Sequence, residues 1–384
     1  MKSNSGKSFI GSYVLGMGFV LSSDKAKELI KNNPRNKDVL FPYLNGDDLN
    51  STPEQKPSRW VINFFDWDEE KAKSYPDCYE IIEKLVKPER QRWKIDSAGN
   101  EIIGTYALRK PLPQKWWIYG EKRPALYKAI SELDQVIIIP LVSKYSTFEF
   151  SITNTVFMHK LGVLVLNDYH NFALLSSSIH NLWCWKYSST LGAGTLNYST
   201  TDCFENYPFP QSQKISLQNI GKQYHHHRKY LTLRIQLGLT KIYNLFHSEN
   251  IQESTDPNDN RIQYLKKHLE KKGLICDYKF VIENIIKLRE LQIQIDQAVL
   301  AAYEWNDIQL NHGFYDLEYL PENDRFRFTI HPTARKEILK RLLLLNLQRY
   351  DEERKFVSLQ TNIGEKKQTV VTSKNLNHTL FPED

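Results

Sequence analysis

The sequence is 384 residues long, enough for about two or three domains and a sizeable buried core. Hydrophobic residues make up 41% of the chain and charged residues 25%, a composition that excludes a disordered or fibrous protein. The net charge of +6 permits a polyanionic partner without requiring one.

Up to about residue 210, short apolar runs alternate with Gly, Pro and Asn, a pattern that predicts strands. Helices are predicted at 24–31, at 68–86 and in the stretch that begins with FALLSSSIH. The sequence therefore predicts an α+β domain with a mixed or antiparallel sheet over residues 1–210. Its predicted strands are SYVLGMGFVL, RWVINFF, KWWIYG, QVIIIPLVS, NTVFM and GVLVLND.

From about residue 215, apolar residues recur at helical spacing in three long segments. The preceding segment YPFPQSQ, residues 207–213, contains two prolines and is the natural boundary between the halves. We therefore expect a mostly helical C-terminal domain over 211–356, followed by a polar, frayed tail over 357–384.

Cysteine usage and apolar runs favour a cytoplasmic protein. The four cysteines are far apart and form no CxxC pair, which argues against a zinc module or a disulfide framework. The longest apolar runs are only strand-sized, and the N-terminus lacks the apolar region of a signal peptide. We expect neither secretion nor membrane insertion.

Motifs for methyl transfer are missing from the sequence. The glycine pairs at 16–18 and 192–194 lack the strand–loop–helix context of a cofactor loop, and tight turns explain them better. An enzyme that methylates an extruded base at its amine needs a short Pro-Pro element, and this chain has no Pro-Pro dipeptide. We therefore predict no cofactor-binding and no catalytic residues in this chain.

Two other groups of polar residues allow an enzymatic interpretation but favour a structural one. Asp77, Glu80 and Lys84 resemble a Mg²⁺-dependent nuclease site, yet they lie in an amphipathic helical pattern whose charged residues usually face solvent. The histidines at 225–227 would point about 100° apart on a helix and cannot converge on one metal ion. With Arg228, Lys229 and Arg234 they predict a basic helix surface.

The strongest local signal is a basic stretch over residues 84–128. It has eleven Lys and Arg against four Asp and Glu, a balance of +7 that exceeds the +6 of the whole chain. Cations spaced among aromatic rings suit phosphate contacts and base reading, although a solvated face over a Trp-lined core has the same composition. The interleaved aromatic residues are Trp93, Tyr106, Trp116, Trp117, Tyr119 and Tyr127.

Longer strings are more specific than these single motifs. In their order along the chain they resemble the target-recognition region of MmeI-like DNA adenine methyltransferases, the type IIG and IIL restriction-modification proteins and their phage-defence relatives. The resemblance covers about residues 8–352. It is carried by FIGSYVLGMGFVLS, NPRNKDVLFPYLNGDDLNSTPEQKPSRWVINFFDW, KWWIYGEKRPALYKAI, FALLSSSIHNLWCWKYSSTLGAGTLNYSTTDCFENYPFP, RIQLGLTKIYNLFH and RFTIHPTARKEILKRLLLLN.

In that family the cofactor-binding and catalytic motifs precede the recognition region. The resemblance therefore implies that this chain reads double-stranded DNA, while S-adenosylmethionine binds the complete enzyme or a catalytic methyltransferase partner polypeptide. Two alternatives stay open: a self-sufficient DNA nuclease that uses Asp77, Glu80 and Lys84, and a helical protein-interaction scaffold. From charge and placement, the predicted DNA contacts are Arg90, Arg92, Arg109, Lys110, Lys115, Arg123 and Lys144.

Overall fold

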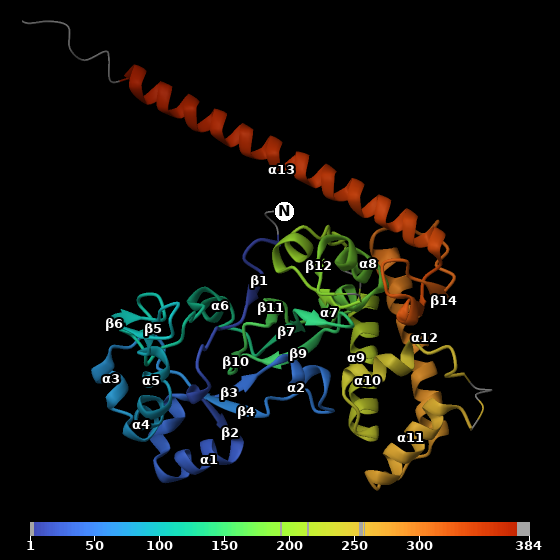
Figure 1. Cartoon of the computed structure of the whole chain (residues 1–384). Coiled ribbons are helices and arrows are strands. Elements are labelled where there is room, and N and C mark those ends of the chain that lie inside the picture. Colours follow the sequence, from blue (N-terminus) through green and yellow to red (C-terminus); the bar gives the residue numbers. More distant parts are fainter. Residues whose placement is uncertain (1–3, 193, 213–214, 253–255, 257, 375–384) are drawn as a thin grey trace, which may run out of the picture.

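The computed structural model describes residues 4–192, 194–212, 215–252, 256 and 258–374. Its secondary structure is α+β, as predicted, with the sheets concentrated in the first half and long helices in the second (Figure 1).

Two four-stranded sheets organise the first half. One has the order β1-β11-β7-β9 and is antiparallel throughout. The other, β10-β3-β4-β2, is mixed because β10 pairs in parallel with β3. The strands are β1 (Ser8–Ile10), β2 (Val20–Ser22), β3 (Leu40–Leu44), β4 (Arg59–Ile62), β7 (Gln135–Pro140), β9 (Glu149–Ile152), β10 (Val156–Phe157) and β11 (Leu161–Leu164).

Strand β7 explains why its sequence is a continuous apolar run. Val136 and Ile138 pack into one hydrophobic core, and Ile137 and Ile139 pack into another. Successive side chains of a strand point to opposite faces, so a strand covered on both faces needs an apolar residue at every position.

Proline and capping residues set the helices of the first half. The Ser22 hydroxyl accepts a hydrogen bond from the Lys25 amide and starts the predicted helix α1 (Ser23–Asn32). The helix predicted at 68–86 is two helices, α3 (Glu69–Lys73) and α4 (Pro76–Leu85), since Pro76 lacks an amide hydrogen and suits a first helical position. Likewise Ser177, in an extended conformation, separates α7 (Tyr169–Ser176) from α8 (Ser178–Tyr187).

The strand predicted at KWWIYG is wrong. This segment forms turns, and Trp116, Trp117, Ile118 and Tyr119 are all buried rather than alternating in burial. They complete a core with β4 and α4, so the run is apolar because the core surrounds it.

The second half is built from long helices, as predicted, and its core crosses the predicted boundary at residue 210. That core contains β7, α7 and α8 from the first half together with α9 and α12 from the second. A Cβ atom at Gly221 would lie 2.2 Å from the carbonyl oxygen of Tyr169, so glycine permits the close approach of α9 to α7. The helices here are α9 (Ile215–Ile235), α10 (Leu239–Phe246), α11 (Asn260–Lys271), α12 (Tyr278–Ala302) and α13 (Pro332–Lys374).

Helix α13 projects from the body of the molecule (Figure 1). It continues to Lys374, so the tail predicted from residue 357 is helical up to that position, and 375–384 lie outside the described residues. None of the helices in the described ranges combines the length and apolar character needed to cross a membrane. The remaining elements are η2 (Met17–Phe19), η3 (Pro34–Asp38), α2 (Gly46–Asn50), α5 (Lys87–Arg90), β5 (Trp93–Ile95), β6 (Glu101–Tyr106), α6 (Pro124–Ala129), β8 (Val142–Ser143), β12 (Ser189–Thr190), β13 (Leu196–Asn197), η4 (Thr200–Glu205), β14 (Gly313–Asp316), η5 (Glu322–Asp324) and β15 (Phe326–Thr329).

Candidate nucleic-acid interface

The basic stretch, residues 84–128, runs from the end of α4 through α5, the β5–β6 hairpin and the turns that follow it to α6. Figure 1 shows the hairpin at the edge of the sheet-rich half, on the side away from α9 to α12. The hairpin is a separate two-stranded sheet, so one part of the basic stretch stands apart from the main sheets.

Apart from Lys84, six cations of this stretch are exposed. Within the described part of the chain, none of them forms a salt bridge, whereas the neighbouring Lys84, Lys87 and Lys122 are paired with Glu80, Glu83 and Asp66. Uncompensated positive charge on one exposed segment is what phosphate binding requires. The six are Arg92, Lys94, Arg109, Lys110, Lys115 and Lys128.

Local contacts bring several of these cations together. The amide of Ala107 donates to the Arg92 carbonyl oxygen at 2.9 Å, which places Arg92 beside the segment that continues to Arg109 and Lys110. The Gln91 side chain donates to the Pro113 carbonyl oxygen at 3.0 Å and ties the base of the hairpin to the following turns. The structure therefore brings the segments that carry Arg92, Arg109 and Lys110 close together.

The hairpin is stabilised from within. The rings of Trp93 and Tyr106, which face each other across the strands, stack with centroids 4.8 Å apart and planes 7° apart. The Asp96 carboxylate accepts hydrogen bonds from the amides of Ala98 and Asn100 and closes the turn. A two-stranded ribbon of this kind is narrow enough to enter the major groove of DNA.

The other aromatic residues of the stretch belong to the core. The Trp117 indole nitrogen donates to the Trp67 carbonyl oxygen at 3.0 Å, and the Tyr119 hydroxyl donates to that of Ile62 at 2.7 Å. The stretch therefore contains both a buried, Trp-lined core and exposed cations without salt bridges; their role as DNA contacts stays a prediction.

Arg90 does not fit its predicted role as a DNA contact. Its side chain is fully buried, and its guanidinium donates to the carbonyl oxygens of Val14, Leu15, Trp116 and Ile118. Burial lowers the pKa of Arg90 to about 10. A guanidinium occupied in this way holds three chain segments together and cannot reach a phosphate.

Arg123 and Lys144 are compensated by acids. Arg123 forms a salt bridge with Glu121. The ammonium of Lys144 lies 3.0 Å from an Asp324 carboxylate oxygen and 3.2 Å from the Asn244 side-chain oxygen, between the sheet-rich half and the helical half. Neither shares the uncompensated exposure of the six cations.

The basic surface expected on α9 is only partly present, since Arg234 is exposed and Lys229 half-buried, but Arg228 is not part of it. Arg228 is buried and pairs with Glu149 at 3.0 Å, and His225 bonds to the same carboxylate. Burial raises the pKa of Glu149, but Arg228 and His225 outweigh that effect and lower it to about 2. His226 contacts the Tyr169 hydroxyl and His227 the Asn284 carbonyl oxygen, so the three imidazoles diverge.

The groups considered for catalysis are not brought together either. The Asp77 carboxylate accepts hydrogen bonds from Asn33 and Asn36, while Glu80 and Lys84 pair with each other in solvent.

The glycine pairs give no cofactor loop either. A Cβ atom at Gly18 would lie 2.5 Å from Leu85 Cβ, so this glycine serves packing. Ala193 of the second glycine pair lies outside the described residues. Among the described residues, the one group with metal-ligating geometry is in the core, on α8 and η4.

Comparison with known proteins agrees with this architecture. A family model described as MmeI, target recognition domain, matches residues 8–211, ending beside the predicted boundary at 210. A solved structure of the Type IIL restriction-modification enzyme MmeI in complex with DNA is similar with a TM-score of 0.51 and 13% identity. The similarity covers 90% of this chain and 36% of that enzyme's chain, and at this identity it shows the fold alone. None of the curated proteins is similar to this chain.

Proposed function

The chain belongs to the family of MmeI target recognition domains, and we propose that it recognises a DNA sequence for a restriction-modification enzyme. The observation that carries the proposal is the set of six exposed, unpaired cations on and beside the β5–β6 hairpin. Phosphate binding by such residues releases counterions and supplies sequence-independent affinity.

Within this proposal the lysines and arginines have different tasks. Lys94, Lys110 and Lys115 contact phosphates and fix the position of the duplex. Arg92 and Arg109 have the planar, two-pronged donor that can also read a guanine edge in the major groove, where a good bidentate pair contributes about 1–3 kcal/mol of discrimination.

We further propose that the reaction served is methylation of adenine with S-adenosylmethionine. The sequence has no Pro-Pro dipeptide to hold a target amine, so the catalytic residues and the cofactor are assigned to a methyltransferase polypeptide that acts with this chain. In that arrangement this chain binds the duplex, and the partner extrudes and methylates the adenine. Type IIG organisation, a role in phage defence and a cytoplasmic location belong to the same proposal.

The first experiment measures binding of the full chain to a mixed-sequence duplex by fluorescence anisotropy over a range of salt concentrations. Joint replacement by alanine of Arg92, Lys94, Arg109 and Lys110 should reduce the slope of log affinity against log salt by about 3 to 4, because each lost phosphate contact reduces it by about 0.9.

A control variant of equal charge loss separates this surface from general electrostatics. It carries alanine at Lys25, Lys31, Lys73 and Lys84, which are exposed on helices outside the hairpin surface. The control should keep most of the salt slope. If both variants lost the same amount of salt slope, or if the first variant lost none, the hairpin would not be the DNA-binding surface.

The second experiment tests the enzymatic part. The chain is co-expressed with the neighbouring open reading frame, purified, and assayed for transfer of tritiated methyl groups to duplex DNA. Transfer that requires both polypeptides supports the proposal, and transfer by this chain alone contradicts it. A chain with no DNA affinity at low salt would instead favour the helical scaffold.

A further inference from the structure

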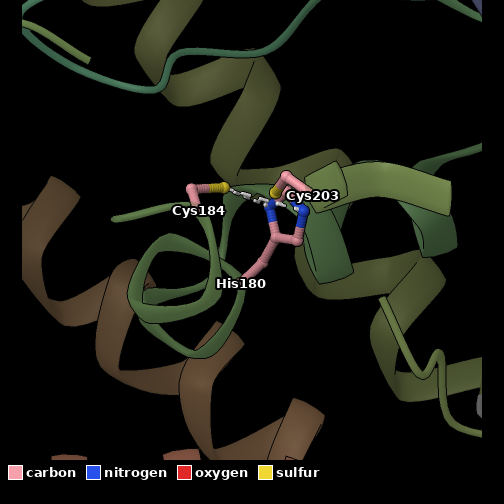
Figure 2. A group of neighbouring side chains, drawn as sticks. All are labelled: His180, Cys184 and Cys203. Carbon is pink, nitrogen blue, oxygen red and sulfur yellow. Dashed lines mark hydrogen bonds between the residues drawn. The ribbon is translucent and has the colours of Figure 1, made fainter. Parts of the chain in front are cut away.

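Three metal-binding side chains meet in the core, away from the proposed DNA surface. His180 and Cys184 lie one turn apart on α8, and Cys203 comes from η4, a π-helical turn (Figure 2). Their ligand atoms all lie within 4.8 Å of one another, and all three residues are fully buried. Imidazole and thiolates are the donors that zinc prefers.

The backbone around the group is fixed by hydrogen bonds. The Ser177 hydroxyl accepts from the His180 amide at the start of α8, and the Trp183 indole donates to the Cys203 carbonyl oxygen at 3.0 Å. Residues four apart on a helix lie on the same face, so His180 and Cys184 both face η4. Two elements, α8 and η4, therefore bring the three donors together.

The imidazole of His180 is oriented as in a metal site. Its Nδ1 lies 3.0 Å from the Leu175 carbonyl oxygen, which can only accept, so Nδ1 carries the hydrogen and the Nε2 lone pair is left for a ligand. Metal-binding histidines usually donate their second N–H to such a carbonyl group. The Cys184 sulfur lies 3.5 Å from Nδ1 and 3.8 Å from Nε2, so it sits beside the ring and has to move toward the Nε2 lone pair for both atoms to bind one Zn²⁺.

We propose that His180, Cys184 and Cys203 bind a structural Zn²⁺ ion that joins α8 to η4. Two thiolates neutralise the charge of the ion, so the complex brings no net charge into the core. Since the whole group is buried, the ion would stabilise the fold rather than bind a substrate.

The test is the zinc content of the full chain, purified without chelator and measured by inductively coupled plasma mass spectrometry. We expect a stoichiometric amount of zinc in the wild type and background levels in Cys184→Ser and Cys203→Ser. Two matched controls should keep the metal: Cys276→Ser at a half-buried cysteine and Cys78→Ser at a buried cysteine, both outside the group.

A measurement on the wild type alone guards against variants that fail to fold. The chain is unfolded, freed of metal with a chelator, and refolded with excess Zn²⁺, with Co²⁺, or with chelator present. Zinc uptake, a thiolate-to-cobalt charge-transfer band and a lower Tm in chelator would support the site. Refolded wild type without zinc and with a Tm unaffected by chelator would overturn it, and a content of copper alone would overturn the assignment to Zn²⁺.

Discussion

Positive charge is used differently in the basic stretch and at the junction between the sheet and the helices. On the β5–β6 hairpin and beside it, Arg92, Lys94, Arg109, Lys110 and Lys115 are exposed and have no carboxylate within salt-bridge distance among the described residues. At the junction, Arg228 is buried against the Glu149 carboxylate, and within the helical half Arg289 is buried against carbonyl oxygens. The comparison teaches that a count of Lys and Arg identifies a phosphate-binding surface only after the buried cations are removed from it.

Arg289 shows what a buried arginine contributes. Its guanidinium donates to the carbonyl oxygens of Phe246, Ser248 and Ile251, at and just beyond the end of α10. Phe246 is the last residue of α10, so its carbonyl oxygen has no amide partner within the helix, and a cation there satisfies it and opposes the negative end of the helix dipole. Arg90 likewise donates to buried carbonyl oxygens, although its sequence position is inside the basic stretch.

The largest expected effect separates Arg90 from its neighbour Arg92. Arg90→Ala leaves four buried carbonyl groups without a donor and should lower the free energy of unfolding by about 4 kcal/mol or more. Arg92→Ala, at an exposed position, should change it by no more than about 0.5 kcal/mol. Urea unfolding followed by tryptophan fluorescence measures the stability of both variants. Equal free energies of unfolding would show that Arg90 does not stabilise the fold more than Arg92 does.

The next effect concerns the buried pair of Glu149 and Arg228. The pKa of Glu149 is lowered from 4.5 to about 2, so the native state binds fewer protons than the unfolded state in this range. The carboxylate therefore stabilises the fold above about pH 4.5, and this contribution is lost as the pH falls toward 2.

Glu149→Gln tests this dependence. Removal of one member of a buried pair should lower the free energy of unfolding by about 3 kcal/mol at neutral pH and make it less sensitive to acid. Denaturant unfolding of both proteins from neutral pH to about pH 3 gives the comparison. A variant with the same acid dependence as wild type would show that Glu149 is not the group responsible.

The smallest expected effect is at the paired cations. Lys144→Ala removes a charge that Asp324 already compensates, so DNA affinity should change less than about twofold and the salt slope should stay the same. Lys110→Ala, at an unpaired position, should reduce the slope by about 1. Anisotropy titrations of the two single variants test this, and a larger loss at Lys144 would extend the DNA surface toward the helical half.

Much of the architecture was predictable from local patterns. The Ser22 cap, the apolar run of β7 and the long periodic segment of α12 each depend on neighbours in the sequence, and the structure confirms them. The strand prediction at KWWIYG failed because strands and core-filling turns have the same composition when every side chain is buried. The family was predictable because several long strings, taken in their order along the chain, resemble its members, although no single motif was specific.

The sequence by itself determined the α+β class, the family and the location of the basic stretch, since these follow from periodicity, residue order and charge along the chain. Only the tertiary structure decided which cations face solvent, because burial depends on segments far apart, as when Arg90 meets Val14 and Ile118. It likewise placed Cys203 beside His180 and Cys184. No short spacing signals that meeting, since the π-helical turn η4 and helix α8 come together only when the core forms.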